Sequence, residues 1–352
     1  MIYNRLIFKI NVVLLGLLLS LSVLAETSRG LARQVIQDNY RALVIGNNNY
    51  QDPKGRWQVL ETAVADAQSV SELLKTDYGF TDVTLLTNAS RREIINALAA
   101  LAKRTQADDS VVVFYAGHGH LDEWRGQGFW IPVDATAGEI TSYIRNSAIR
   151  DEISVIASRA KHTLLISDSC FSGALLRPGA RGKQRGDNSE RYYQKVANKK
   201  SVQILAAGGF EFVDDNYRGS GHSPFTHFLL NELKHNNNAL LTASELSFNV
   251  ERAVANNVQQ TPESGVLQGA GDELGEFIFA RLDTTLPPME PISPSPIIAV
   301  TPSEIPIARP EKKRPFWKNP WFWVGTLTAT AAAGYALNSG SSSSDDGDVV
   351  YK

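Results

Sequence analysis

The sequence is poor in cysteine and has no excess of either charge. Its 352 residues include one cysteine, Cys170, which excludes an intrachain disulfide and a zinc site built from several thiolates. Lysine and arginine number 35 against 37 aspartates and glutamates, so no basic field points to nucleic acid as a partner. No glycine-rich loop ends in Gly-Lys-Ser/Thr, which disfavours phosphate chemistry. Hydrophobic residues at 43% and charged residues at 20% are typical of a globular protein.

Residues 1–25 have the three parts of a secretory signal peptide. Arg5 and Lys9 precede an apolar run at 10–24, and Ala25 supplies the small residue before polar sequence. The run is short for a membrane span, and an uncleaved anchor is the alternative. Either interpretation predicts that the rest of the protein is exported to a periplasmic or other extracytoplasmic compartment.

The end of the sequence has the composition of a linker followed by an anchor. Residues 286–318 are rich in proline and end in a basic cluster, which predicts an extended linker. Segment 319–338 has no charged residue, and its apolar part would be about 25 Å long as a helix, just enough to cross the hydrocarbon. We therefore expect a transmembrane helix here and a flexible polar tail at 339–352. An Ala/Gly-rich packing helix is the alternative, because the basic cluster would lie on the outer side of the span.

Between these parts, residues 26–285 are expected to form one globular domain. Short apolar runs predict buried strands at 41–46, 83–86, 111–115, 163–166 and 202–206. Apolar residues at helical spacing predict helices at 60–78, 90–101, 149–160, 225–233 and 243–254. Ser90 and Glu93 form a capping box at the start of the second helix. The alternation indicates an α/β fold with a mostly parallel sheet covered on both faces.

Two of the predicted strands end in residues suited to nucleophilic catalysis. The third runs into Gly117-His118-Gly119, and the fourth into Asp168-Ser169-Cys170. If these strands are neighbours, His118 and Cys170 leave the same sheet edge side by side. The histidine would then set the protonation of the thiol and protonate the leaving amine, while amides of Gly119 and Cys170 stabilise an oxyanion. A lone cysteine at a strand end is more often a buried apolar residue, so only the pair favours catalysis.

Five blocks of the sequence resemble those of the caspase-like cysteine peptidases. In order, they are Ala42–Gly46, Ala63–Ala67, Tyr115–Gly119, Asp168–Gly173 and His222–Thr226. Caspases carry their histidine about 50 residues before the cysteine, and the gap here is 170 − 118 = 52 residues. The most similar branch is that of the metacaspases and their bacterial relatives, the orthocaspases. Over residues 40–280, the resemblance implies a caspase-hemoglobinase-like three-layer fold and a cysteine endopeptidase with Cys170 as nucleophile and His118 as general acid/base.

The resemblance also bears on the substrate. Metacaspase-like enzymes cleave protein or peptide substrates after Arg or Lys and use carboxylates to hold that residue. Their positions correspond to Asp66 and Asp168, with Ala63 and Ala116 at small pocket positions. Two carboxylates in a partly dry pocket would attract one guanidinium. The plain alternatives are an exposed helix face for Asp66 and a local backbone acceptor for Asp168. One departure is Phe171, where many metacaspases have histidine.

Several alternatives remain open from the sequence. The domain could be a catalytically weak scaffold for recruitment, or a peptidase that cleaves after Asp with a pocket lined by Arg41, Arg56 or Arg125. No cofactor is required for the chemistry. Calcium, which many metacaspases bind, has candidate ligands in Asp187, Asp214 and Asp215 by proximity only.

A basic, glycine-containing segment at 177–200 is predicted to be a surface loop. Family members are often cleaved in this region, and the segment offers the basic residues that an acidic pocket selects. Self-processing here is therefore a further expectation. A weak anionic-surface patch is the alternative. The oligomeric state is not indicated by the sequence.

Overall fold

The computed structural model of the protein describes residues 39–169, 175, 190–208, 215–267 and 269–282. The expected leader, proline-rich linker, transmembrane helix and polar tail lie outside the described residues, as do Cys170, Phe171, Asp187 and Asp214. In the part of the chain that is described, no helix combines the length and the apolar character that a membrane crossing requires.

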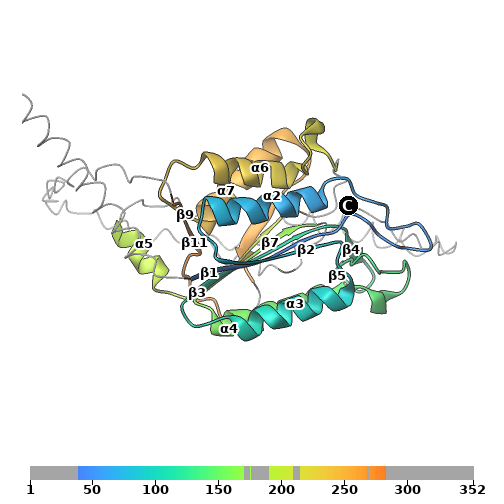
Figure 1. Ribbon diagram of the computed structural model, residues 1–352, viewed down its shortest axis with the longest axis horizontal. Helices are drawn as coiled ribbons and strands as arrows, with labels where there is room; N and C mark the ends of the chain where they lie inside the picture. The colour runs from blue at the N-terminus through green and yellow to red at the C-terminus, as the bar shows by residue number, and fades with distance from the viewer. Residues whose placement is uncertain (1–38, 170–174, 176–189, 209–214, 268, 283–352) are drawn as a thin grey trace, which may run out of the picture. The chain divides into compact units, whose positions relative to one another are not determined.

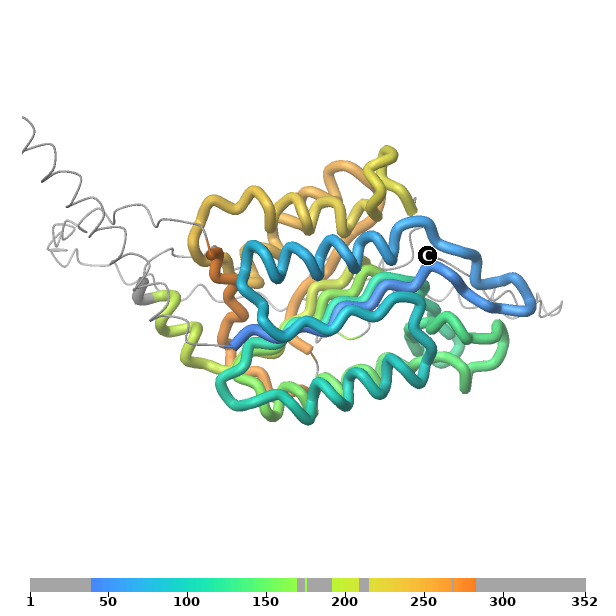
Figure 2. The backbone as a smooth tube through the Cα atoms, in the orientation of Figure 1, coloured from blue at the N-terminus to red at the C-terminus, as the bar shows by residue number. Residues whose placement is uncertain are grey.

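A six-stranded sheet forms the centre of the domain (Figure 1). Its strands, in spatial order, are β10 (Glu263–Val266), β8 (Ser201–Ala206), β7 (His162–Asp168), β3 (Asp109–Ala116), β1 (Asn39–Gly46) and β2 (Asp82–Thr87). All neighbours pair in parallel except β10 with β8. Figure 2 follows these strands side by side although they come from distant parts of the sequence. The predicted mostly parallel sheet is confirmed.

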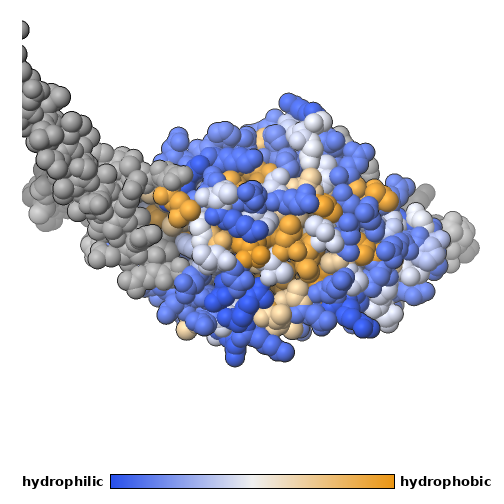
Figure 3. Space-filling model, viewed as in Figure 1, coloured by the Kyte–Doolittle hydropathy of each residue, from blue (hydrophilic) through white to orange (hydrophobic). Residues whose placement is uncertain are grey.

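Helices cover both faces of the sheet and complete three layers (Figure 1). On one face lie α2 (Ala63–Thr76), α6 (Pro224–His235) and α7 (Ala243–Asn257). On the other lie α3 (Arg91–Arg104) and α4 (Asn146–Arg159). Figure 3 shows hydrophobic residues gathered in the band between the helical layers and hydrophilic residues on the outer faces. The α/β fold class is as expected.

The core is divided in two by the sheet. Val112 and Phe114 of β3 pack in a cluster with α2, α6 and α7, whereas Val111 and Val113 pack with α3 and α4. Successive side chains of a strand point to opposite faces, so a sheet covered on both sides needs apolar residues at every strand position. All eight residues of β3 are buried, and the last six are hydrophobic for this reason.

Local signals fix the helix starts near the carboxyl ends of the strands. The expected capping box of Ser90 and Glu93 begins α3. Ser223 caps α6, with Pro224 in the first turn, where its missing N–H costs nothing. A Cβ on Gly46 would lie 2.3 Å from the Ala63 carbonyl oxygen, so only glycine lets α2 start directly against the end of β1. This contact brings the first turn of α2 to the sheet edge.

Several short strands lie outside the central sheet, and one of them, β5 (Gln127–Trp130), overlaps a short extended segment expected at 129–133. A small antiparallel sheet contains β4 (Gly119–Asp122), β5 and β6 (Ile144–Arg145), and a second pairs β9 (Leu240–Thr242) with β11 (Ile278–Ala280).

The prediction of a loop throughout 177–200 is wrong in its last part, which forms helix α5 (Glu190–Ala197). Tyr193, Val196 and Ala197 are buried there. Their spacing puts them on one helical face, and the surrounding charges hid that short apolar face in the sequence.

Candidate functional site

The predicted neighbours of the site do meet at one edge of the sheet. β3 and β7 pair in parallel, with Ala116 opposite Asp168. The N–H of Gly117 donates to the carbonyl of Asp168 at 3.3 Å. His118 therefore follows directly after a backbone contact between the two strands. Cys170 stands two residues beyond Asp168 in the sequence, outside the described residues.

His118 is buried, with 4% of its surface exposed, and its ring has a defined orientation. Its Nε2 lies 2.8 Å from the carbonyl oxygen of Gln58. A carbonyl oxygen only accepts, so Nε2 carries the hydrogen and the lone pair of the neutral ring is on Nδ1. The rings of Tyr50 and Trp57 contact the imidazole at centroid distances of 4.6 and 5.8 Å. Nδ1 is consequently the nitrogen that can act as a base.

Two tyrosine hydroxyls hold the backbone at this position. The N–H of His118 donates to the Tyr50 hydroxyl at 2.8 Å, and the Tyr115 hydroxyl donates to the carbonyl of His118 at 3.0 Å. Burial raises the pKa of both phenols well above the ordinary range, so both stay protonated. A Cβ on Gly117 would lie 2.7 and 2.8 Å from the two hydroxyl oxygens. The site therefore requires glycine before its histidine.

The loop that supplies Gln58 is organised by Asp52. Its carboxylate accepts the backbone N–H groups of Arg56 at 2.7 Å, Trp57 at 3.2 Å and Lys54 at 3.2 Å, and that of Ala137 at 3.0 Å. Burial alone would raise the pKa of Asp52, but these four donors lower it. The charge of one carboxylate thus fixes the loop segment that orients His118.

The two predicted pocket carboxylates are joined by a single serine. The Ser223 hydroxyl donates to Oδ2 of Asp168, and the backbone N–H of Ser223 lies 3.4 Å from Oδ2 of Asp66. Thr226 also donates to Asp168, at 2.7 Å. Asp66 is 1% exposed and further accepts Nδ1–H of His222 at 2.7 Å, and its Oδ2 lies 3.2 Å from the Thr62 hydroxyl oxygen. Asp66 is therefore not on an exposed helix face.

The remaining predicted residues are close by in the fold. Ala63 begins α2 and Ala116 ends β3, and both belong to the apolar cluster on the α2 side of the sheet. Gly119 begins β4, where it pairs with Trp130. The structure thus gathers Ala63, Asp66, Ala116, His118 and Asp168 at the carboxyl ends of the strands.

Sequence reasoning gave no role to Tyr50, Gln58, His222 and Ser223. Ser223 carried a usable signal, since serine followed by proline is typical of a helix start. Tyr50 and Gln58 are 68 and 60 residues from His118 in the sequence, and no periodicity reports a contact across that separation.

A sequence model described as the caspase domain, of peptidase family C14, matches residues 39–268, which is more than half of the chain. The protein belongs to the caspase-domain family. This is a family of cysteine peptidases, which are hydrolases acting on proteins. The match does not distinguish the metacaspase or orthocaspase branch within it.

Among solved structures, the chain is similar to a structural genomics target from Geobacter sulfurreducens known from a crystal structure. The two are 22% identical, with a TM-score of 0.45, and the similarity covers 71% of this chain and 100% of the other. No curated protein matches the chain.

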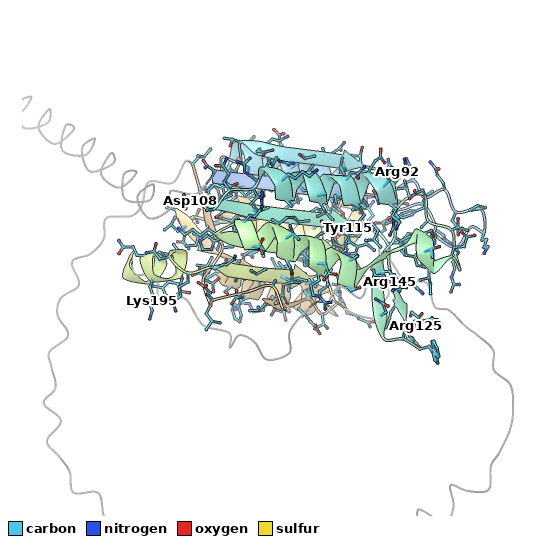
Figure 4. The ribbon with its side chains drawn as sticks, turned by 90° about the horizontal axis from the view of Figure 1, so that it is seen from below. Arg92, Asp108, Tyr115, Arg125, Arg145 and Lys195 are labelled. Carbon is cyan, nitrogen blue, oxygen red and sulfur yellow. The ribbon has the colours of Figure 1, made fainter. Side chains whose placement is uncertain are left out.

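The three arginines considered for an Asp-specific pocket differ in their positions in this caspase domain. Arg41 pairs with Asp82 and Asp109 at the start of β1, the edge opposite the carboxyl ends of the strands. Figure 4 views the α3–α4 side, with Asp108 at one end and Tyr115 and Arg145 toward the other. Arg125, on the turn between β4 and β5, is half exposed and pairs with Asp122 at 2.5 Å.

Arg56 belongs to the loop held by Asp52. Among the described residues, no hydrogen bond or ion pair joins Arg41, Arg56 or Arg125 to Asp66 or Asp168.

Of the acidic residues considered for calcium, Asp215 lies within the described residues. The backbone carbonyl of Asp215 accepts the Thr62 hydroxyl at 2.7 Å, and its carboxylate accepts the backbone N–H of Glu61. Within the described ranges, no group of three or more histidine, aspartate or glutamate side chains could hold a metal ion.

Proposed function

We propose that this caspase domain is a cysteine endopeptidase that hydrolyses peptide bonds after Arg or Lys. The catalytic pair is His118 and Cys170. The observation that carries the specificity is the joining of Asp66 and Asp168 through Ser223 beside the strand end that bears His118. A cationic side chain is the natural partner of two carboxylates held this close together.

The proposed chemistry follows from the orientation of His118. The thiol of Cys170 gives its proton to Nδ1, and the sulfur attacks the carbonyl carbon of the substrate. The imidazolium then returns the proton to the leaving amine as the C–N bond breaks, which leaves an acyl-enzyme. Water then gives a proton to the same nitrogen and attacks the thioester carbonyl. The C–S bond breaks, and the imidazolium returns the proton to the sulfur. The carbonyl of Gln58 holds Nε2–H and so keeps the correct nitrogen basic through both steps.

Backbone amides of Gly119 and Cys170 are proposed to receive the oxyanion of the tetrahedral intermediates. Gly119 directly follows His118, so an amide donor at this position lies next to the base. Such donors act where negative charge develops and typically contribute a factor of roughly 10² to 10³ in rate.

The test uses short fluorogenic peptides ending in Arg, Lys or Asp, with wild type, Cys170→Ala and Asp168→Asn. We expect turnover of the Arg and Lys peptides by wild type, loss of it in Cys170→Ala, and at least about a hundredfold lower kcat/KM in Asp168→Asn. Asp151→Asn is the matched control. The side chain of Asp151 is 76% exposed, and its ion pair with Arg150 is long, at 3.8 Å. Equal turnover by wild type and Cys170→Ala would contradict the peptidase proposal and favour the scaffold alternative. Turnover of the Asp peptide alone would contradict the pocket and favour the Asp-specific alternative.

Self-processing within 177–200 is proposed from the same pocket. Arg177, Arg181, Lys183 and Arg185 are the candidate sites in the part that lies outside the described residues. Lys195 lies within α5, where helical backbone resists entry into a peptidase site. Intact-mass measurement of wild type and Cys170→Ala tests this, and fragments that persist in the alanine variant would exclude self-cleavage.

We further propose an exported protein that is tethered to a membrane through 319–338 and acts on protein or peptide substrates. The leader at 1–25 and the apolar segment near the end of the chain support this. Calcium is proposed only as a modulator, to be tested by repeating the peptide assay with calcium and with a chelator.

A further inference from the structure

His222 lies between the buried carboxylate of Asp66 and solvent. Its Nδ1 is 2.7 Å from Oδ1 of Asp66, and its side chain is 22% exposed while that of Asp66 is 1% exposed. A carboxylate only accepts, so Nδ1 carries the hydrogen in the neutral ring. The second nitrogen, Nε2, has no hydrogen-bond partner among the described residues. The ring can therefore take up a second proton at Nε2 without breaking its bond to Asp66.

The charged groups around His222 are mostly acidic. Asp66 from α2 contacts it directly, Asp168 from the end of β7 binds the neighbouring Ser223, and Asp215 reaches Asp66 through Thr62. Protonation of His222 would place a positive charge inside the same group of carboxylates that is proposed to receive the substrate cation.

Two basic groups also belong to this region. His227 in the first turn of α6 has its pKa lowered by burial and by the charge of His222, which disfavours a second positive charge beside that ring. Arg218 precedes His222 in the same loop and lies over the ring of Tyr217 at 5.0 Å. Its charge is constant with pH, so it cannot produce a titration.

We propose that His222 is a specificity-determining residue that makes recognition of Arg or Lys depend on its own protonation. This inference rests on the proposed function and concerns the same pocket. With His222 neutral, Asp66 and Asp168 together present two negative charges to the substrate. With His222 protonated, one of those charges is compensated and a cationic side chain is bound less tightly. Binding of the cation to the protonated form releases one proton from Nε2 to solvent.

The size of the expected effect follows from the charges involved. Histidine is the side chain whose charge ordinarily changes between pH 5 and 8. Two like charges a few ångströms apart at a protein surface repel strongly enough to change an affinity roughly tenfold or more. A neutral ligand of the same shape would show no such change, which separates charge from packing.

The experiment measures binding to the full chain carrying Cys170→Ala, which removes turnover. The probes are N-acetyl-arginine amide and its neutral isostere N-acetyl-citrulline amide, titrated by calorimetry from pH 5 to pH 8. We expect the affinity for the arginine probe to fall roughly tenfold or more toward pH 5, with the citrulline probe unchanged. Proton release on binding, measured in buffers of different ionisation enthalpy, is expected near the midpoint.

His222→Asn in the same background is the decisive variant. The asparagine amide nitrogen takes the place of Nδ1 and keeps a donor for Asp66, but it does not titrate. The pH dependence of arginine binding is expected to disappear, with affinity held at the high-pH level. His235→Asn is the matched control, since His235 is exposed at the far end of α6 and bonds only to the carbonyl of Asn231 among the described residues. The affinity of this control variant for the arginine probe is expected to depend on pH as in the protein with His235 intact.

The outcomes separate the two proposals. Equal arginine affinity at pH 5 and pH 8 in wild type, or the same pH dependence in His222→Asn, would overturn the role of His222 and leave the acidic pocket intact. No preference for arginine over citrulline at any pH would overturn the pocket itself. His222→Gln, which also lacks a titrating group, is measured in parallel so that one poorly folded variant does not decide the result.

Discussion

At the scale of single residues, the orientation of His118 depends on contacts made by its backbone as much as by its ring. Tyr50 accepts its N–H and Tyr115 donates to its carbonyl, while Gln58 fixes the ring nitrogen. Tyr50 and Tyr115 are buried, and the loop that carries Gln58 is held by Asp52, so a shift of any of these groups would move the imidazole. Tyr50 and Tyr115 are positioning residues, because they act through His118.

Tyr50→Phe is therefore expected to lower activity without preventing substrate binding. The substitution leaves the buried N–H of His118 without its acceptor, at a cost of about 1–3 kcal/mol. We predict a roughly tenfold or greater fall in kcat on an Arg peptide with KM nearly unchanged. Tyr192→Phe in the distant helix α5 is the control. A change in KM alone, or equal losses in both variants, would show that Tyr50 does not position the base.

Gly117→Ala tests the same contacts by steric means. The added methyl group would lie under 3.0 Å from both tyrosine hydroxyls, so either the hydroxyls or the His118 backbone must shift. We expect at least about tenfold lower kcat together with a lower melting temperature. Gly126→Ala, at a turn where a Cβ meets nothing within 4 Å, controls for the loss of glycine at a positive φ. Normal activity in Gly117→Ala would contradict the close fit.

At the scale of elements, the loop between β1 and α2 carries a charge whose state should be visible in the stability of the protein. The pKa of Asp52 is lowered in the folded state, although burial alone opposes this. A carboxyl group of this kind stabilises the fold above its unfolded pKa of about 3.9, and the contribution is lost as pH falls through the lower folded value. The loop is thus expected to loosen only in acid.

Asp52→Asn should remove much of that contribution at neutral pH, because one amide oxygen replaces two charged acceptors of four N–H groups. We predict a lower melting temperature at pH 7, with the difference from wild type shrinking as pH falls below about 4. Thermal melts from pH 3 to pH 7 measure this, with Asp151→Asn as the exposed control. A difference that grows in acid would have the wrong sign for a lowered pKa.

The elements that the sequence predicts are those whose signal is local. The strands β1, β3 and β7 each contain a continuous apolar run because both faces of the sheet are covered, and the capping box of Ser90 and Glu93 predicts the start of α3. The strands of the β4–β5–β6 sheet are two to four residues long, too short for any period to appear. Helix α5 is not predicted from the sequence, because its buried apolar residues span little more than one helical turn.

The residues of the site likewise divide into those that the sequence indicates and those that only the tertiary structure brings together. His118 follows from a strand end, and the pocket roles of Asp66 and Asp168 follow from the resemblance to caspases. Their joining through Ser223 depends on α6 being placed beside β7, which is a tertiary fact with no local signal. Arginines such as Arg41 could be set aside only once the ends of the sheet were known.

At the scale of the whole molecule, residues at the end of the domain contact its first strand. β11 pairs with β9, and the carbonyl of Ile278 accepts the Tyr40 hydroxyl from β1 at 2.7 Å. Phe277 and Phe279 are fully buried, and Arg281 pairs with Asp77 at 3.2 Å. The last strand therefore belongs to the core although it contributes nothing to the site.

This connection predicts where the chain can be shortened. A protein spanning 26–285 retains every contact described around His118 and Asp168, so we expect a single unfolding transition and kcat/KM on a soluble peptide within about twofold of the full chain. A protein ending at residue 276 loses Phe277 and Phe279. Removing one buried phenylalanine side chain costs about 3–5 kcal/mol, and two such losses approach the whole stability of an ordinary domain, about 5–15 kcal/mol. We expect the shorter protein to be unfolded by circular dichroism, and a cooperative melt at the temperature of the 26–285 protein would show that β11 is dispensable.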